Sequence, residues 1–360
     1  MSTNNDATNK NELIKKNKDE LLDHKNELME PKHELMESSR ELTKSQKNAM
    51  TPIQSSIEQM PDEGLQTVTA QNIQVNDDIN KYISTYIDLT KQLKEKMQAR
   101  KPLVHHITNF VTIYQCARIT SFLGASPVMA FSAAEAAEVT AVADALVINT
   151  GTLNDEFIKS IPISLATAKA HHIPVVLDPV GINLSDYRHD FIMDILQNHR
   201  FSVLRCNGVE LLNVYGKLMR GSGIDGSLDN AQENASANNP SPSADRDNIH
   251  SLAFSVAQAA KDIAQKYHCT VACTGKTDVI SDGVTTLYFS RGSDLLPKLV
   301  GTGCMMNSLI ASFLPVAASP LEAATAGILT MSLASEAAEA RLESPNQLGS
   351  FETYLLDAIR

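Results

Sequence analysis

The stretch Pro174-Val175-Val176-Leu177-Asp178-Pro179-Val180-Gly181 carries the clearest structural signal in the chain. Its apolar run is continuous rather than alternating, which is typical of a strand buried on both faces of a sheet. Asp178 and Pro179 then indicate a turn at the end of the strand. Similar runs recur along the chain, and Ala-rich helical segments lie between most of them. The alternation predicts an α/β fold with a central, mainly parallel sheet flanked by helices.

The same reading gives bounds for each element. Strands are predicted over residues 103–108, 127–130, 145–150, 174–178, 202–207, 270–274 and 284–289. Helices are predicted over residues 79–97, 133–142, 155–171, 190–199 and 251–267. In a parallel sheet the carboxyl ends of the strands lie along one edge, where ligands bind. The residues that directly follow each apolar run are therefore the first candidates for a functional site.

Composition excludes several classes of partner. The chain has 360 residues, of which 43% are hydrophobic, enough for a sizeable core. A formal charge of -11 argues against nucleic acid or an anionic membrane as the main partner. The five cysteines are scattered and odd in number, which fits a reducing compartment. Because no signal peptide or membrane-spanning run is evident, we expect a cytoplasmic protein.

Two segments differ from the rest of the chain. Residues 1–78 are charged, repetitive and free of aromatic side chains, and they predict a mostly disordered tail. Leucines spaced by seven or eight residues leave a short oligomerising helix as the alternative, although Pro31 interrupts it. Residues 217–248 are rich in Ser, Asn and Asp and predict a polar surface insertion. A catalytic domain is then expected over residues 79–360.

Polar residues at successive strand ends form a chemically consistent set. Asp178 ends one run, a second run leads into Arg205, Asn207 and Glu210, and a third leads into Thr274 and Gly275. Carboxylates suit Mg²⁺, while a guanidinium and backbone N–H groups suit phosphates. The set therefore indicates a site for a magnesium–nucleotide complex.

Residues Gly301-Thr302-Gly303-Cys304 lead into an apolar stretch that predicts a buried helix. A helix N-terminus presents free N–H groups and a partial positive charge, which together bind anions. Glycines allow the backbone to approach a ligand closely. At such a position we expect the pKa of the Cys304 thiol to fall. Taken alone, the pattern favours a glycine turn before a packed helix that holds an inert buried cysteine.

Each candidate also has a structural interpretation. Asp178 could simply end a strand, Glu210 could be a solvated residue of a first helical turn, and Arg205 could pair with a structural carboxylate. Joint occurrence at successive strand ends favours the functional interpretation. His105 and His106 are adjacent on a predicted strand and point to opposite faces, so a core or pocket-wall role is favoured over a shared metal.

These residues give the chain a resemblance to the hydroxyethylthiazole kinase family, thiamine-salvage enzymes of the ribokinase-like superfamily. The resemblance covers residues 79–360 apart from the insertion. It is carried by the stretches 102–109, 124–130, 149–153, 174–181, 207–210, 301–304 and 349–358. It implies a three-layer ribokinase-like fold and ATP-dependent phosphorylation of the hydroxyl of 4-methyl-5-(2-hydroxyethyl)thiazole. It also implies a homotrimer whose active sites lie between subunits.

The resemblance further implies roles for individual residues. The family's Mg²⁺ carboxylates match Asp178 and Glu210. Its nucleotide-binding residues match Arg205, Asn207, Thr274 and Gly275. Its thiazole pocket matches Met129, Asn109, Gly151, Thr152 and Gly301. Its anion hole and catalytic base match Gly301, Gly303 and Cys304.

Some features depart from the family pattern, and two other functions remain open. Lys276 stands where the family often has Glu, and Cys206 stands where Gly is common. A related kinase acting on a hydroxymethylpyrimidine, pyridoxal or a sugar is one alternative. Cys304 argues against it, because those kinases usually carry Asp there. The other alternative is a catalytically silent binder of thiazole or nucleotide that uses the tail as an interaction arm.

Overall fold

The computed structural model describes residues 70–216 and 244–360. The chain divides into two compact units, Met1–Lys81 and Tyr82–Arg360. Most of the predicted tail and of the predicted polar insertion lies outside the described residues. Helix α3 (Ala70–Arg100) begins ahead of the expected start at residue 79, and α10 (Ala244–Tyr267) begins inside the segment assigned to the insertion.

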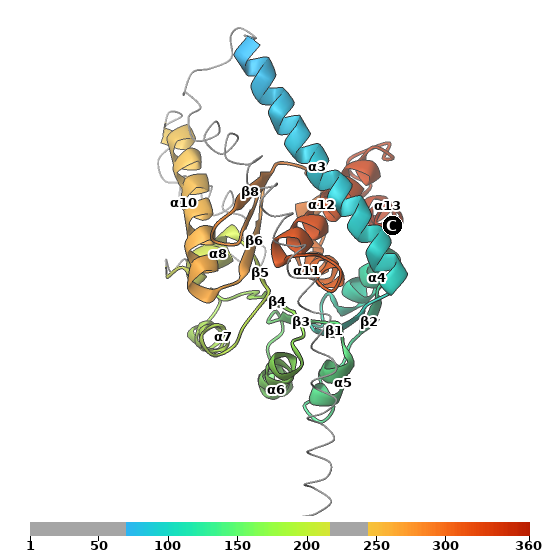
Figure 1. Ribbon diagram of the computed structural model, residues 1–360, viewed down its shortest axis with the longest axis vertical. Helices are drawn as coiled ribbons and strands as arrows, with labels where there is room; N and C mark the ends of the chain where they lie inside the picture. The colour runs from blue at the N-terminus through green and yellow to red at the C-terminus, as the bar shows by residue number, and fades with distance from the viewer. Residues whose placement is uncertain (1–69, 217–243) are drawn as a thin grey trace, which may run out of the picture. The chain divides into compact units, whose positions relative to one another are not determined.

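An eight-stranded sheet lies at the centre of the second unit (Figure 1). Its strands are β1 (Leu103–Ile107), β2 (Ser126–Val128), β3 (Ala145–Asn149), β4 (Val175–Asp178), β5 (Val203–Asn207), β6 (Thr270–Thr274), β7 (Asp278–Ser281) and β8 (Thr286–Phe289). Their order in the sheet is β2-β1-β3-β4-β5-β6-β7-β8. The pairs from β2 to β6 are parallel, whereas β6–β7 and β7–β8 are antiparallel. The predicted α/β fold with a mainly parallel sheet is thus confirmed.

Strand β7 is the one strand of this sheet that the sequence pattern did not indicate. It has four residues and follows β6 after the short turn at residues 275–277. The turn residue Gly275 donates its N–H to the Asp278 carboxylate at 3.1 Å. A segment this short, with polar residues at both ends, has too little apolar pattern to be recognised alone.

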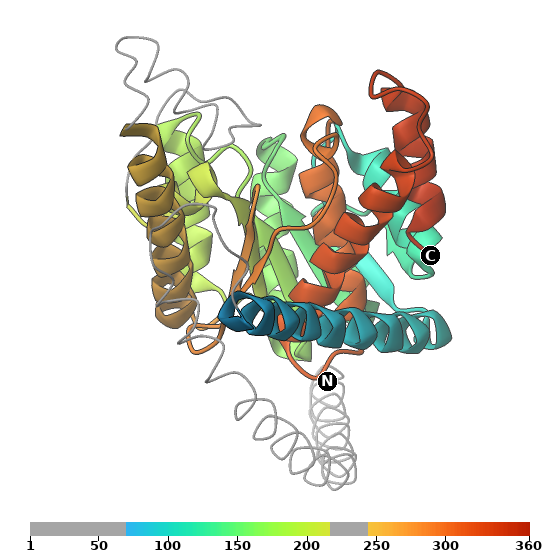
Figure 2. The ribbon, with the colours of Figure 1, turned by 90° about the horizontal axis from the view of Figure 1, so that it is seen from above.

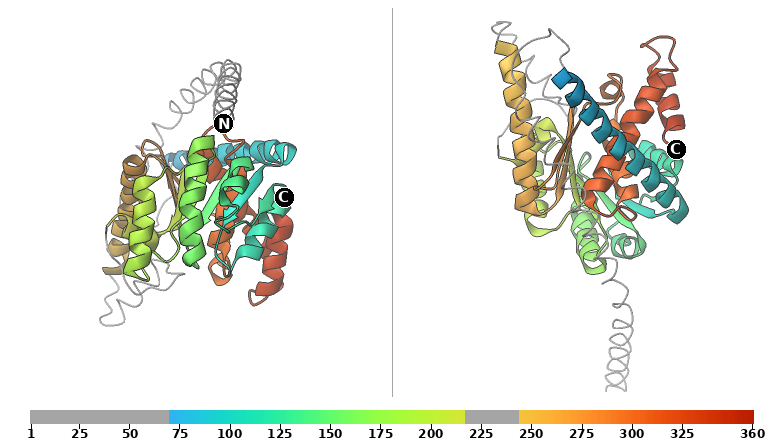
Figure 3. Two further views of the ribbon diagram at one scale, coloured as in Figure 1. Left: turned by 90° about the horizontal axis from the view of Figure 1, so that it is seen from below. Right: turned by 45° about the horizontal axis from the view of Figure 1, so that its top comes forward.

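Helices cover both faces of the sheet and complete three layers (Figures 2 and 3). One layer contains α5 (Ala136–Val142), α6 (Asp155–His171), α7 (Asp186–Asn198), α8 (Gly208–Val214) and α10. The other contains α4 (Ile113–Leu123), α11 (Thr302–Phe313), α12 (Pro320–Glu339) and α13 (Leu348–Ala358). Helix α11 packs on β1, β3 and β4, which places its first turn beside the strand ends. No helix among residues 70–216 and 244–360 is long and apolar enough to cross a bilayer.

Local signals explain several helix boundaries. The Asn154 side chain accepts the N–H groups of Glu156 and Phe157, so α6 begins where the pattern predicted. The Ser185 hydroxyl accepts the N–H of Arg188 and starts α7 four residues earlier than its apolar pattern indicated. Boundary errors of this size arise because a polar cap precedes the first buried residue of a helix.

The adjacent histidines of β1 belong to the core, on opposite faces of the sheet as predicted. His105 Nδ1 lies 3.0 Å from the Thr140 hydroxyl of α5, and its Nε2 contacts the Ala130 carbonyl. His106 Nε2 lies 3.1 Å from the Ser308 hydroxyl of α11. Both rings are fully buried, and every ring nitrogen has a partner. They are therefore satisfied core residues.

Candidate active site

The carboxyl ends of β4 and β5 place a carboxylate and a guanidinium together. Asp178 ends β4 and is fully buried, and Arg205 of β5 lies with its Nη1 3.7 Å from Asp178 Oδ2. Burial raises the pKa of Asp178 to about 6, although the Arg205 charge and the amides of Asn307 and Asn149 act in the opposite direction. Asp178 Oδ1 and Arg205 Nε are buried without a hydrogen-bond partner. Such atoms are uncommon in a closed core and suggest that a polar ligand completes the site.

Three asparagine side chains form a hydrogen-bond network at Asp178, two by direct contact and the third through Asn149. Asn149, which pairs with Asp178 in the β3–β4 register, donates its amide to Asp178 Oδ2 at 2.9 Å. Asn307 of α11 donates to the same oxygen from the other side. Asn109 follows β1 and donates to Asn149 Oδ1 at 2.9 Å. These amides hold the carboxylate in one orientation, because each side chain is itself buried.

Cys304 lies in the first turn of α11 and contacts the same amides. Asn109 Nδ2 is 3.2 Å and Asn149 Nδ2 is 3.4 Å from its sulfur. Burial and the Asp178 charge raise the pKa of the thiol, while hydrogen bonds from Thr112 and Asn109 lower it. The expected fall in the pKa of Cys304 is therefore wrong. The helix N-terminus is present, but desolvation of the thiolate outweighs it.

Two glycines before Cys304 allow a close approach of the backbone. Gly301 is the N-cap of α11 with φ +92°, and a Cβ there would lie 2.5 Å from Thr112 Cγ2. A Cβ on Gly303 would lie 2.5 Å from Arg205 Nη1. The guanidinium therefore lies directly against the first turn of α11. This contact joins the predicted anion hole to the predicted phosphate-binding arginine.

Glu210 is buried rather than solvated. Its carboxylate accepts the Asn207 N–H at 2.9 Å, and the Asn207 side chain accepts the Glu210 N–H at 2.9 Å, which forms a capping box at the start of α8. The Gly181 N–H donates to its other oxygen at 3.3 Å. Burial and then the Asp178 charge raise the pKa of Glu210 to about 8. Part of the role expected for Asn207 is thus structural, because its oxygen caps a helix.

The end of β6 contributes the neighbouring residues. Arg205 Nη2 contacts the Thr274 hydroxyl at 2.5 Å, and Gly275 continues into the β6–β7 turn. Burial raises the pKa of Asp278 at the end of this turn to about 7, with the Gly275 N–H acting in the opposite direction. The side chain of Lys276 is exposed.

The candidate thiazole-binding residues separate into two groups. Gly151 lies against Asn109, since a Cβ on it would be 2.9 Å from Asn109 Cβ, and the Thr152 hydroxyl accepts the Phe110 N–H at 3.0 Å. Met129 instead follows β2, the edge strand, and β1 separates that strand from β3. The structure therefore groups Asn109, Gly151 and Thr152 and leaves Met129 at the sheet edge.

Arg188 of α7 is a residue that sequence reasoning missed. Its Nη1 contacts the carbonyl oxygens of Thr150, Gly151 and Val180. It thereby ties the loop after β3 to the loop after β4. Asn149 and Asn307 were also missed as site residues. Asn149 could have been found from its place at the end of a buried strand, whereas Asn307 lies within an apolar helix that gives no such signal.

The residues present fit a divalent cation bound together with a nucleotide. Asp178 has an unpartnered, buried carboxylate oxygen, and the Asp178 charge raises the pKa of Glu210. A cation would offset this repulsion, and oxygen ligands are those that Mg²⁺ prefers. Among the described residues, no group of three or more His, Cys, Asp and Glu side chains is arranged so that it could hold a metal ion by itself. The remaining ligands would thus come from phosphate and water.

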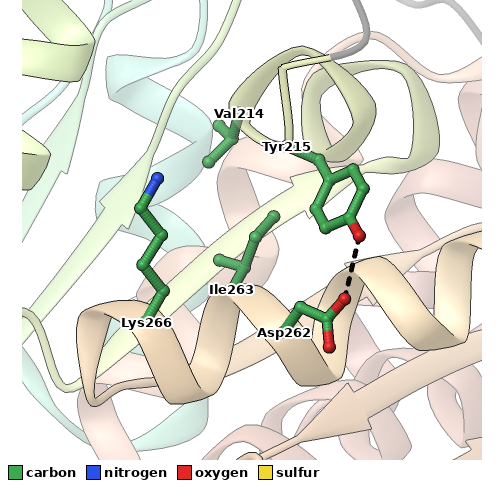
Figure 4. A pocket seen from close by; sticks show the side chains of 5 residues that line it. All are labelled: Val214, Tyr215, Asp262, Ile263 and Lys266. Carbon is green, nitrogen blue, oxygen red and sulfur yellow. Dashed lines mark hydrogen bonds between the residues drawn. The ribbon is translucent and has the colours of Figure 1, made fainter.

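A separate pocket lies between the end of α8 and α10 (Figure 4). Its lining is Val214, Tyr215, Asp262, Ile263 and Lys266, and Tyr215 donates its hydroxyl to Asp262 at 2.9 Å. None of the candidate site residues lines it. Its polar lining side chains are exposed or half-buried and lie over apolar ones, and it has no buried unpartnered charge like that of Asp178.

Comparison with known proteins identifies the family. The family model described as "Hydroxyethylthiazole kinase family" matches residues 94–241 and 245–360. The chain belongs to the hydroxyethylthiazole kinase family. The match covers every candidate site residue. Family membership confirms the predicted kinase class and the predicted activity on hydroxyethylthiazole.

Individual members of the hydroxyethylthiazole kinase family are similar over most of their length. The hydroxyethylthiazole kinase of Alkaliphilus metalliredigens is 39% identical over 273 residues, which are 76% of this chain and 92% of that protein. That of Clostridioides difficile is 39% identical over 258 residues, or 72% and 88% of the two chains. The solved hydroxyethylthiazole kinase structure from Pyrococcus horikoshii is 32% identical with a TM-score of 0.61, and covers 77% and 92%. The similarity of the two folds confirms the predicted α/β architecture with its mainly parallel sheet.

Proposed function

We propose that this site transfers the γ-phosphoryl group of ATP to the hydroxyl of 4-methyl-5-(2-hydroxyethyl)thiazole, within thiamine salvage. The contact of Arg205 with Gly303 carries the proposal. It brings a guanidinium, a helix N-terminus and the Cys304 thiol to one place, beside the buried Asp178. In the transition state of transfer, the phosphoryl group needs cationic and N–H donors around it and an oriented acceptor hydroxyl next to it.

On the nucleotide side, Arg205 and Thr274 would contact the phosphates, with Asn207 and Gly275 beside them. The Arg205 Nε has no protein partner, so a donor remains for a phosphate oxygen. The N–H groups of Gly301, Gly303 and Cys304 would receive the charge that develops on the transferred group.

On the acceptor side, Asn109, Gly151, Thr152, Gly301 and Met129 would enclose the thiazole. Cys304 would orient the hydroxyl and accept its proton late in the reaction. Only the thiolate form of Cys304 can take up this proton, and because burial raises the pKa of the thiol, the thiolate is a strong base for it once formed.

Asp178 and Glu210 would hold Mg²⁺, directly or through water. When bound, the cation supplies positive charge that neutralises phosphate oxygens during transfer. The protein's own contribution is to keep the Asp178 carboxylate oriented by Asn149 and Asn307.

We also propose a homotrimer with active sites between subunits, in the cytoplasm. Helix α4 exposes Tyr114 and Phe122 with Arg118 stacked between their rings at 5.4 and 5.3 Å. An exposed aromatic stripe of this kind favours a protein interface. Met129 at the sheet edge would then be within reach of a neighbouring copy. The five cysteines are all free, which fits a reducing compartment.

A coupled ADP-release assay tests the activity. Purified protein with Mg-ATP should turn over hydroxyethylthiazole far faster than hydroxymethylpyrimidine or ribose, and turnover should stop when a chelator removes the metal. Preference for one of the other two acceptors would reassign the substrate. Ligand-induced stabilisation without ADP release would indicate a silent binder.

Sedimentation tests the assembly. The wild-type chain should sediment as a trimer, and Tyr114→Asp, which puts a charge into the aromatic stripe, should shift the mass toward the monomer. A monomeric wild-type chain with full activity would contradict the shared active site.

A further inference from the structure

The side chain of Asn149 uses both ends of its amide inside the site. Its Nδ2 donates to Asp178 Oδ2 at 2.9 Å and to Cys304 Sγ at 3.4 Å. Its Oδ1 accepts from Asn109 Nδ2 at 2.9 Å and from the Gly151 N–H at 2.9 Å. Both N–H groups and both lone pairs are therefore engaged. The side chain is fully buried and has no freedom to choose other partners.

We propose that Asn149 is a positioning residue that couples the Asp178 carboxylate to the Cys304 thiol and both to the acceptor pocket. The inference rests on the proposed function, in which Cys304 orients the hydroxyl and Asp178 acts on the phosphate side. A single rigid amide then fixes the position of the Cys304 sulfur, which orients the hydroxyl, relative to the Asp178 carboxylate on the phosphate side. A displacement of either group would lower the rate because in-line transfer depends on alignment.

The orientation of the amide follows from its neighbours. The Gly151 N–H can only donate, so the atom facing it is the oxygen. Asp178 lies at the opposite end, and its charged carboxylate can only accept, so that end is the nitrogen. The two ends of Asn149 therefore face chemically different halves of the site.

The neighbouring amides of Asn307 and Asn109 each donate to only one of the two groups that Asn149 contacts. Asn307 donates to Asp178, and Asn109 donates to Cys304, but Asn149 donates to both. Its position on β3 explains this, because that strand lies between β1, which leads to Asn109, and β4, which ends at Asp178. The backbone of Asn149 is therefore held on both sides by the pairing of β3 with β1 and β4.

The test replaces Asn149 with the isosteric Asp. Asn149→Asp keeps acceptor oxygens for Asn109 and Gly151 but removes both N–H donors and adds a charge beside Asp178. We expect kcat for hydroxyethylthiazole to fall by about 10²-fold while KM for the thiazole stays within about threefold. Alkylation of Cys304 by iodoacetamide at fixed pH, followed on the Cys304 peptide, should slow by about fivefold or more.

Asn198→Asp is the matched control, because Asn198 is exposed at the end of α7. It should keep the wild-type kcat and labelling rate. If Asn149→Asp does not fold, Asn149→Ser removes the amide without adding a charge, and the same two effects are expected. Thermal unfolding of each variant identifies the one that is folded.

Two results would overturn the inference. One is an Asn149 variant that is folded and matches Asn198→Asp in kcat and in Cys304 labelling. The other is a lower kcat with unchanged labelling, which would indicate a general structural role. If the wild-type chain does not phosphorylate the thiazole, the proposed function fails. The labelling comparison still decides whether Asn149 holds Cys304.

Discussion

Two buried polar groups of the same sheet differ in one respect, the completeness of their hydrogen bonds. His105 and His106 on β1 have a protein partner for every ring nitrogen. At the ends of β4 and β5, Asp178 Oδ1 and Arg205 Nε have none. The histidines belong to a closed core, whereas the charged pair has binding capacity that the protein itself does not use. Buried polarity alone therefore does not mark a site, whereas a buried charged pair with unpartnered atoms points to a ligand.

Burial acts on the two groups in the same sense. It favours the neutral form of each, so the pKa of His106 falls to about 4 while the pKa of Asp178 rises to about 6. A neutral imidazole that contacts a carbonyl and a hydroxyl has both ring nitrogens paired, so it needs no opposite charge. A carboxylate in a similar environment is kept ionised by opposite charge and by N–H donors, which here come from Arg205 and from the Asn307 and Asn149 amides. In the proposed complex the cation would add to this positive charge.

The largest effect is expected when the Asp178 charge is removed. This variant tests whether the unpartnered charged pair, unlike the two histidines, has a function. Asp178→Asn should lower kcat by about 10³-fold or more, because the phosphate side loses its buried anion. Coupled ADP release measures the effect. Asp190→Asn, at an exposed carboxylate, serves as the control. Full activity of Asp178→Asn would mean that the unpartnered oxygen has no functional role.

A second variant tests the thiol. Cys304→Ala should lower kcat by about 10²-fold or less with a modest change in KM, since Cys304 orients the hydroxyl and, as the thiolate, takes its proton late. Cys269→Ala, at a buried cysteine of the core, should leave kcat close to the wild-type value. Unaltered turnover in Cys304→Ala would remove Cys304 from the catalytic role.

The histidine pair predicts an effect on stability rather than on rate. The pKa of His106, about 4 when folded against an ordinary 6.5, means that its stabilising contribution is complete above pH 6.5 and is lost as the pH falls toward 4. Between pH 7 and 5 this loss is about 2 kcal/mol of unfolding free energy. Urea unfolding should show that His106→Gln lacks this part of the pH dependence. A collapse of kcat at pH 7.5 in the same variant would place His106 in the site.

The smallest effect is expected at the pocket between α8 and α10 (Figure 4). Tyr215→Phe removes an exposed hydrogen bond to Asp262 and should change the unfolding free energy by less than about 0.5 kcal/mol. Turnover of hydroxyethylthiazole should not change. A clear loss of activity would show that a hollow surface without unused buried polarity still contributes to catalysis.

The sequence predicted the architecture and many of the residues that meet at the site. Continuous apolar runs gave the parallel strands, and the residues after them supplied Asp178, Arg205, Thr274 and the glycine turn. The raised pKa of Cys304 could not be predicted, because it depends on how much protein covers the sulfur. The roles of Asn307 and Arg188 could not be predicted either, since Asn307 reaches Asp178 from 129 residues away and Arg188 reaches Thr150 from 38 residues away.

The chain's own order of residues determined the α/β alternation, the strand ends and the glycines that allow a close approach, because these depend on local periodicity and backbone freedom. Only the tertiary structure decided which buried polar atoms have partners. It closed the hydrogen bonds of His105 and His106, buried Glu210 in a capping box and left Asp178 and Arg205 incomplete. The physical reason is that desolvation and hydrogen bonding depend on neighbours in space, which no single segment specifies.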